Sequence, residues 1–210
     1  MKKIDENKIE YLRMASLDRH GRTFIYDGKF MRGIYKNSDK QIREMFACGL
    51  VERLNNEKLI PLTNVSEYYS EEYAIILEHK MISPVTYVFE WTYHMLLDAG
   101  KMILRLNKVL NEYGYKLWDC HTYNVLFDDN NPVYVDFGSF YSKTENFKRA
   151  FPYEQFKCDY ILTAELIRKR GNLVRNILKI TAPIPESNDH SPSILAMGSE
   201  FDITVSAKII

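Results

Sequence analysis

The chain has 210 residues, of which 46% are hydrophobic and 27% are charged, a composition typical of a globular protein that buries a core. Lys and Arg together number 28, and Asp and Glu also number 28, so the net charge is zero at pH 7. This balance argues against nucleic acid or a membrane surface as the main partner. The length fits one large domain or a two-lobed one.

The cysteines and the N-terminal segment indicate a cellular compartment. Cys48, Cys120 and Cys158 are far apart and form no C-x-x-C pair, so neither a disulfide framework nor a zinc site is predicted. The first residues lack the apolar stretch of a signal peptide, and no apolar run reaches the length of a membrane span. We therefore expect a cytoplasmic protein.

Strands are predicted in the first half of the chain. Residues 22–36 contain two β-prone runs around Asp27-Gly28, a strong signal for a β-hairpin. The runs 58–65 and 72–83 are predicted as two further strands, and the second of them is the more apolar.

Helical periodicity appears in three segments. A helix over 38–58 begins at Ser38 or Asp39, either of which can cap it. The longest helical pattern covers 88–114, and Gly114 is a natural stop. A third helix is expected over 153–172, ending at Gly171.

The element order is a hairpin, a helix, two strands, and then a mostly helical half that contains a second small hairpin. This order predicts an α+β fold with two lobes. We expect a β-rich N-lobe over residues 1–80 and a short helical C-lobe over 81–180. Residues 181–210, which are rich in Pro, Ser, Asn and Asp at their start, are expected to be a tail or a linker.

The most informative stretch is "LWDCHTYNVLFDDNNPVYVDFGSF", residues 117–140. Asp119 and Asn124 are five positions apart, and Asp136 follows the apolar run after an Asn-Asn-Pro turn. Because the two runs pair as a hairpin, Asn124 and Asp136 are expected at the same end of it. Oxygen ligands of this kind suit magnesium, and phosphoryl transfer needs a further carboxylate near the acceptor hydroxyl.

These residues resemble a known family. The patterns D-x-x-x-x-N and D-F-G resemble the catalytic and metal loops of the protein-kinase-like superfamily. The short hairpin between the two motifs and His121 after Asp119 resemble the aminoglycoside and choline phosphotransferase branch more than protein kinases. A nearer resemblance is to the kinase-like N-terminal region of bacterial proteins described as SAM-dependent methyltransferases. It rests on "DGKFMRGIY", "EWTYHMLLDAGKMIL", the 117–140 stretch and "YEQF", and it covers roughly residues 24–170.

The resemblance implies a role for each matched position. Asp119 would accept the proton of the substrate hydroxyl or orient it, and Asn124 and Asp136 would hold Mg²⁺ on the phosphates of ATP. The cofactors implied are therefore ATP and Mg²⁺. Asp128 and Asp129 are expected to be residues of the hairpin tip.

The phosphate-binding lysine and the glycine-rich loop of this superfamily have no clear counterpart. Arg32 is the best-placed cation for the nucleotide phosphates, with Lys29 and Lys36 as rivals, and a solvated strand residue is an equal alternative for Arg32. Glu44 and Glu52 are candidates for its helix partner, and each also fits an ordinary exposed helix face.

Three functions remain open at this point. The first is an ATP- and magnesium-dependent phosphotransferase that acts on a small hydroxylated molecule. The second is a catalytically weak or inactive kinase-like module that binds nucleotide or serves as a scaffold for a methyltransferase or a glycan-modifying partner. The third is transfer of a nucleotidyl group.

Overall fold

The computed structural model describes residues 1–12, 20–143 and 151–181 of the chain. The predicted tail over 181–210 therefore lies outside the described residues, except for Thr181.

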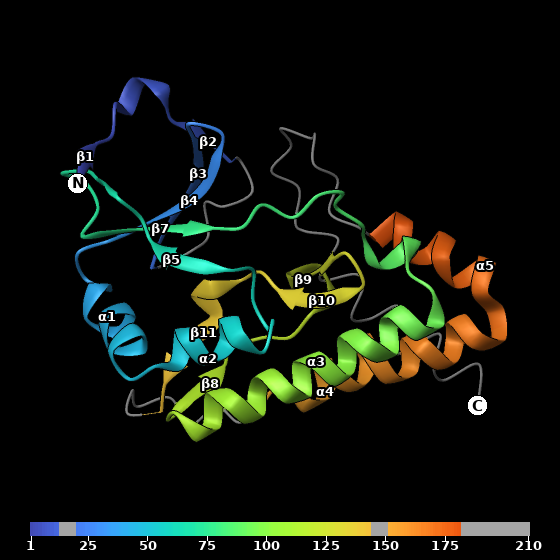
Figure 1. Ribbon diagram of the computed structural model, residues 1–210. Helices are drawn as coiled ribbons and strands as arrows, with labels where there is room; N and C mark the ends of the chain where they lie inside the picture. The colour runs from blue at the N-terminus through green and yellow to red at the C-terminus, as the bar shows by residue number, and fades with distance from the viewer. Residues whose placement is uncertain (13–19, 144–150, 182–210) are drawn as a thin grey trace.

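The first half of the described chain contains a five-stranded antiparallel sheet (Figure 1), with the strand order β2-β3-β4-β7-β5. Its strands are β2 (Glu10–Tyr11), β3 (Gly21–Tyr26), β4 (Lys29–Ile34), β7 (Ile75–His79) and β5 (Thr63–Val65). The predicted β3–β4 hairpin is confirmed. Its two turn residues, Asp27 and Gly28, have φ of 51° and 68°, the left-handed geometry that a two-residue hairpin turn needs.

Both faces of the sheet carry buried side chains. Residues alternate between the two faces along each strand. The inner face carries Arg32, Ile34, Leu77 and His79, which are all buried. The outer face carries a smaller apolar cluster of Ile4, Phe24, Met31, Tyr68, Tyr73 and Ile76. Next to this cluster, β1 (Lys2–Lys3) pairs in parallel with β6 (Tyr68–Tyr69).

The single helix expected over 38–58 is in fact two helices, α1 (Asp39–Ala47) and α2 (Leu50–Asn56). Between them Gly49 has φ of 80°, a left-handed conformation that ends α1. Ser38 occupies the N-cap position without a side-chain cap bond, and its hydroxyl contacts His20 Nδ1 at 3.0 Å. The strand expected over 58–65 is also shorter than predicted, since only β5 is extended.

The long helix of the second half is α3 (Tyr93–Glu112), and a short 3₁₀ turn, η3 (Val88–Glu90), precedes it. The helix therefore begins five residues later than the predicted start at 88, because Thr92 caps it: its side chain accepts a bond from the Met95 N–H. Such a cap satisfies a backbone donor that the first turn leaves without a partner.

The C-terminal helical region consists of three consecutive segments, α4 (Tyr153–Phe156), the π-helix η6 (Lys157–Leu162) and α5 (Thr163–Thr181). The predicted end at Gly171 is wrong, because helical geometry resumes after a kink at Arg170, where φ is −143° and ψ is 38°. No helix within the three described ranges has both the length and the apolar character that crossing a membrane requires.

One large hydrophobic cluster joins the two halves of the molecule. It contains Ile34 and Leu77 from the sheet, Leu54 from α2, Leu106 from α3 and Ile167 from α5. Trp91, which is 0% exposed, packs edge-to-face on Phe127 with ring centroids 5.1 Å apart. The sheet-rich first half and the helical second half confirm the α+β class.

Candidate functional site

Two short antiparallel ladders hold the predicted site loops side by side. In the first ladder β8 (Tyr115–Leu117) pairs with β11 (Phe140–Ser142), with Leu117 opposite Phe140. The Trp118 N–H extends this ladder by donating to the Ser139 carbonyl oxygen at 2.9 Å. Asp119 therefore leaves β8 beside the loop that contains Asp136.

The second ladder is the predicted hairpin of β9 (Val125–Asp128) and β10 (Asn131–Tyr134), which lies between the sheet and α3 in Figure 1. The Val135 N–H donates to the Asn124 carbonyl oxygen at 2.9 Å. Asn124 and Asp136 therefore flank the same end of the hairpin, while the chain closes at the other end through Asp129, where φ is 55°.

Asp119 and Asn124 are joined directly. The Asn124 side-chain amide donates to Asp119 Oδ1 at 2.7 Å and to the Tyr134 hydroxyl at 3.3 Å. The Tyr134 hydroxyl in turn donates to the Asp119 carbonyl oxygen at 3.1 Å. Because both of these bonds use the amide nitrogen of Asn124, its side-chain carbonyl oxygen is the atom left to bind a cation.

Asp136 has a local structural role as well. It is the N-cap of the 3₁₀ turn η5 (Phe137–Ser139). The Gly138 N–H donates to its Oδ1 at 3.2 Å, and the Ser139 hydroxyl donates to its Oδ2. A carboxylate has about four acceptor positions, so these two bonds fix the orientation of Asp136 and leave acceptor capacity on both oxygens.

The electrostatics of the site centre on Asp119. Burial raises the pKa of its carboxyl group, the nearby His121 ring opposes this shift, and the negative charge of Asp136 adds to it. His121 Nε2 lies 3.8 Å from Asp119 Oδ1. A cation between Asp119 and Asp136 would reduce the repulsion that their two charges impose on each other.

Asn124 and Asp136 offer hard oxygen ligands of the kind that magnesium prefers. Among residues 1–12, 20–143 and 151–181 there is no group of three His, Cys, Asp or Glu side chains suited to holding a metal. Asn124 Oδ1 and the Asp136 carboxylate would supply two hard oxygen ligands. Magnesium in nucleotide sites is typically held by one or two protein oxygens together with phosphates and water.

Arg32 is buried on the inner face of the sheet, at 6% exposure. The alternative of a solvated strand residue is therefore wrong. Its positive charge, together with the larger effect of burial, lowers the pKa of His79. The His79 ring faces Phe137, with centroids 5.7 Å apart, so Arg32 lies on the face of the sheet that meets the Asp136 loop.

The rival cations and the predicted helix partners lie elsewhere. Lys29 forms an ion pair with Glu78 at 2.9 Å, and Lys36 is exposed at the end of β4. Glu44 and Glu52 are both exposed on α1 and α2, which is the position of ordinary surface residues.

Sequence reasoning missed three side chains that hold the site together, namely Tyr134, Gln155 and Tyr160. Gln155 accepts a bond from the Cys120 N–H at 2.8 Å, and the Tyr160 hydroxyl donates to the Cys120 carbonyl oxygen at 2.8 Å. A signal for Tyr134 was its place on the strand that leads to Asp136. Gln155 lies in the "YEQF" segment, and the family resemblance of that segment predicted no role for Gln155.

No protein-family model matches the chain. The nodulation protein NoeA of Rhizobium meliloti (strain 1021) is similar to it, with 22% identity over 126 residues, which cover 57% of this chain and 26% of NoeA. The match thus includes about a quarter of the length of that relative, and at this identity it assigns the chain to no family.

Proposed function

We propose that this chain is a kinase-like module that binds ATP with Mg²⁺ and transfers the terminal phosphoryl group to the hydroxyl of a small molecule. The main support is the convergence of Asp119, Asn124 and Asp136, with the Asn124 amide 2.7 Å from Asp119 Oδ1. Three separate positions of the sequence are thereby set around one end of a hairpin, as a magnesium–nucleotide site requires.

The residues divide the chemistry among them. Asp119 accepts the proton of the acceptor hydroxyl. At the same time the oxygen of that hydroxyl bonds to the γ-phosphorus, and the bond from the γ-phosphorus to the leaving ADP oxygen breaks. Burial raises the pKa of Asp119, which is the direction that favours a group that accepts a proton. Asn124 and Asp136 would hold Mg²⁺, which would neutralise charge on the phosphates.

The proposed arrangement has two lobes, with the antiparallel sheet as the smaller and the helices of the second half as the larger. Arg32 is the proposed cation for the nucleotide phosphates, because it is buried on the sheet face toward His79 and Phe137. An Arg in this role can bind phosphate oxygens in a bidentate manner, which Lys cannot do.

A second candidate is a module that binds nucleotide without transferring phosphate. The bonds from Gly138 and Ser139 to both oxygens of Asp136 favour it, since they show that Asp136 also serves as the cap of its own turn. Such a module would act as a scaffold, and a methyltransferase domain or protein is the partner proposed for it.

The first experiment is a thermal shift measurement with ATP, with and without Mg²⁺. A ligand at about one hundred times its Kd stabilises a protein by roughly 2.7 kcal/mol, so we expect the melting temperature to rise with Mg²⁺ and ATP together. Asp136→Ala should abolish the part of the shift that depends on Mg²⁺. Asp129→Asn, at the exposed hairpin tip, is the matched control and should keep it.

The second experiment separates the two candidates. ATP turnover that disappears in Asp119→Asn, while the thermal shift remains, supports phosphoryl transfer. A thermal shift without turnover in the wild type supports the scaffold. Absence of any shift in the wild type, or an equal shift in Asp136→Ala, contradicts the nucleotide site itself.

A further inference from the structure

The peptide groups next to Asp119 are held by side chains from the C-terminal helical region. The Gln155 side-chain oxygen accepts from the Cys120 N–H at 2.8 Å, and the Tyr160 hydroxyl donates to the Cys120 carbonyl oxygen at 2.8 Å. Together with the bond from Tyr134 to the Asp119 carbonyl oxygen at 3.1 Å, these bonds fix two consecutive peptide units. The backbone that carries Asp119 is therefore fastened from two directions.

The helical geometry explains how both side chains reach one residue. Gln155 belongs to α4 and Tyr160 to the π-helix η6, and the ring of Tyr160 stacks on Phe156 with centroids 5.2 Å apart. A π-helix widens the turn, and such segments are frequent at functional sites. Tyr160 lies within η6 and reaches the loop that begins at Asp119 through its bond to Cys120.

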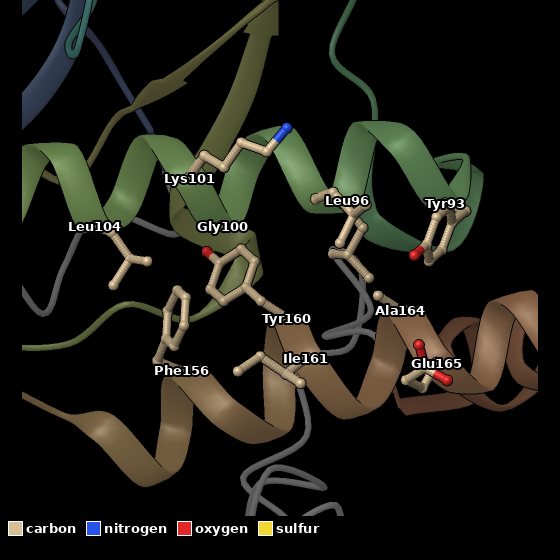
Figure 2. Close-up of a pocket in the computed structure, with 11 residues that line it drawn as sticks. Tyr93, Leu96, Gly100, Lys101, Leu104, Phe156, Tyr160, Ile161, Ala164 and Glu165 are labelled. Atoms are coloured by element: carbon tan, nitrogen blue, oxygen red, sulfur yellow. The ribbon is translucent and has the colours of Figure 1, made fainter.

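Helix α3 provides the space for Tyr160. A Cβ atom on Gly100 would lie 3.3 Å from the Tyr160 Cβ, so the glycine lets the ring approach the helix backbone closely. Figure 2 shows Tyr160 next to Phe156 and facing α3 near Gly100. Both aromatic residues line an apolar groove between α3 and the C-terminal helices, and its volume is about 250 Å³. The ring is 2% exposed, and packing thus leaves its hydroxyl directed at Cys120.

We propose that Gln155 and Tyr160 are positioning residues that set the geometry of the loop from Asp119 to Asn124, and through it the cation-binding oxygen of Asn124. The link from Cys120 to Asn124 passes through Asp119, because the Asn124 amide is bonded to Asp119 Oδ1 at 2.7 Å. A shift of the Asp119 backbone therefore moves Asn124. The consequence for ATP binding rests on the proposed function, whereas the consequence for the loop itself does not.

The variants remove single bonds and leave the packing in place. Gln155→Met keeps the length of the side chain without an acceptor, and Gln155→Glu restores an acceptor oxygen. Tyr160→Phe removes only the hydroxyl. Tyr153→Phe, at a position 58% exposed in the same helical region, is the matched control.

The first measurement uses the ligand-free protein and records the side-chain amide signals of Asn124 by NMR. We expect their hydrogen exchange to quicken about threefold to tenfold in Gln155→Met and Tyr160→Phe, the ratio that corresponds to one neutral hydrogen bond. Gln155→Glu and Tyr153→Phe should match the wild type. Unchanged exchange in both Gln155→Met and Tyr160→Phe overturns the proposal, whether or not the protein binds ATP.

The second measurement compares the Kd for ATP with and without Mg²⁺ by calorimetry, at a temperature where every variant is folded. The gain in affinity from Mg²⁺ should fall about threefold to tenfold in Gln155→Met and Tyr160→Phe, and Gln155→Glu should rescue it. A purely structural role would lower stability without changing this ratio. If the exchange of Asn124 changes but the wild type binds no ATP, the positioning role stands and the proposed function fails.

Discussion

At the inner face of the sheet, His79 Nδ1 and Thr63 Oγ1 lie 2.8 Å apart. Since the Thr63 hydroxyl already donates to the Pro61 carbonyl oxygen at 2.7 Å, Nδ1 must be the donor in the contact with Thr63. The neutral ring then presents Nε2 as an acceptor, and this atom is buried without a hydrogen-bond partner among the described residues. Burial, reinforced by the charge of Arg32, lowers the pKa of His79 to about 3.

This lowered pKa predicts an acid-dependent loss of stability. Above pH 6.5 His79 is neutral in both the folded and the unfolded chain and contributes nothing. Between pH 6.5 and about 3 the unfolded chain binds a proton that the folded chain does not, so the free energy of unfolding falls by on the order of 1 kcal/mol per pH unit. His79→Gln lacks this contribution.

Urea unfolding of the wild type and of His79→Gln at pH 7 and pH 5 measures this contribution of His79 to the free energy of unfolding. We expect the wild type to lose its stability advantage over the variant as the pH falls. A difference that is equal at the two pH values would contradict the prediction. His94→Gln, at an exposed position, is the control. Its free energy of unfolding should differ from that of the wild type by the same amount at both pH values.

The identities of the site residues were partly predictable from the sequence. The spacing of Asp119 and Asn124 and the strand before Asp136 are local features, and they indicated which side chains to consider. The burial of Arg32 was not predictable, because a lone Arg on a strand gives no sign of which face it occupies. The role of Tyr134 was not predictable either, since a Tyr in an apolar run is normally predicted to be a core residue.

Among the elements, strand β4 has little space on its outer face. A Cβ atom on Gly33 would lie 2.4 Å from the ring of Tyr73, which is 4% exposed and stacks on Phe24 with centroids 5.9 Å apart. Strand propensity alone would favour Ala over Gly at this position. The packing of Tyr73 against the strand backbone decides otherwise.

We predict that Gly33→Ala destabilises the protein by roughly 1–3 kcal/mol, the usual penalty for overpacking a core. Urea midpoints measure the effect. The same substitution in a Tyr73→Ala background should cost clearly less, because the clash is then absent. Gly171→Ala, where nothing lies within 4 Å of the added atom, should not destabilise. Equal losses in both backgrounds would refute the explanation.

The errors in predicting helices have local causes. The apolar spacing of 38–58 continues across Gly49, so periodicity alone joined two helices that a left-handed residue separates. Over 153–172 the same reasoning missed the π-helix, since it assumes 3.6 residues per turn. The extra width of η6 is favoured by the tertiary contacts of Tyr160 with Gly100 and Cys120.

For the molecule as a whole, the main core is continuous from the sheet to the C-terminal helix, with Ile34, Leu54, Leu106 and Ile167 in one cluster. Glu57 and Arg105 add a bidentate link between α2 and α3, at 2.6 and 2.7 Å. Elements that share one core usually unfold together.

A single cooperative transition is therefore expected in urea. The fluorescence of Trp91, buried beside α3, and far-UV circular dichroism, which reports all helices and strands, should give the same midpoint. A Trp118→Phe background isolates the signal of Trp91. Two separated midpoints would show that the sheet and the helical half unfold independently, contrary to the shared core.

Three local features could be predicted from the residues alone: the β3–β4 turn at Asp27-Gly28, the β9–β10 hairpin and the polar residues at its end. These local features depend on backbone preferences and short-range spacing, which a few neighbouring residues determine. Three other features depend on how the chain packs: Arg32 is buried, Asp136 caps its own turn, and Gln155 and Tyr160 bond the backbone of Cys120. The last of these contacts join residues 35 and 40 positions apart, and the packing of α3 against the C-terminal helices decides them.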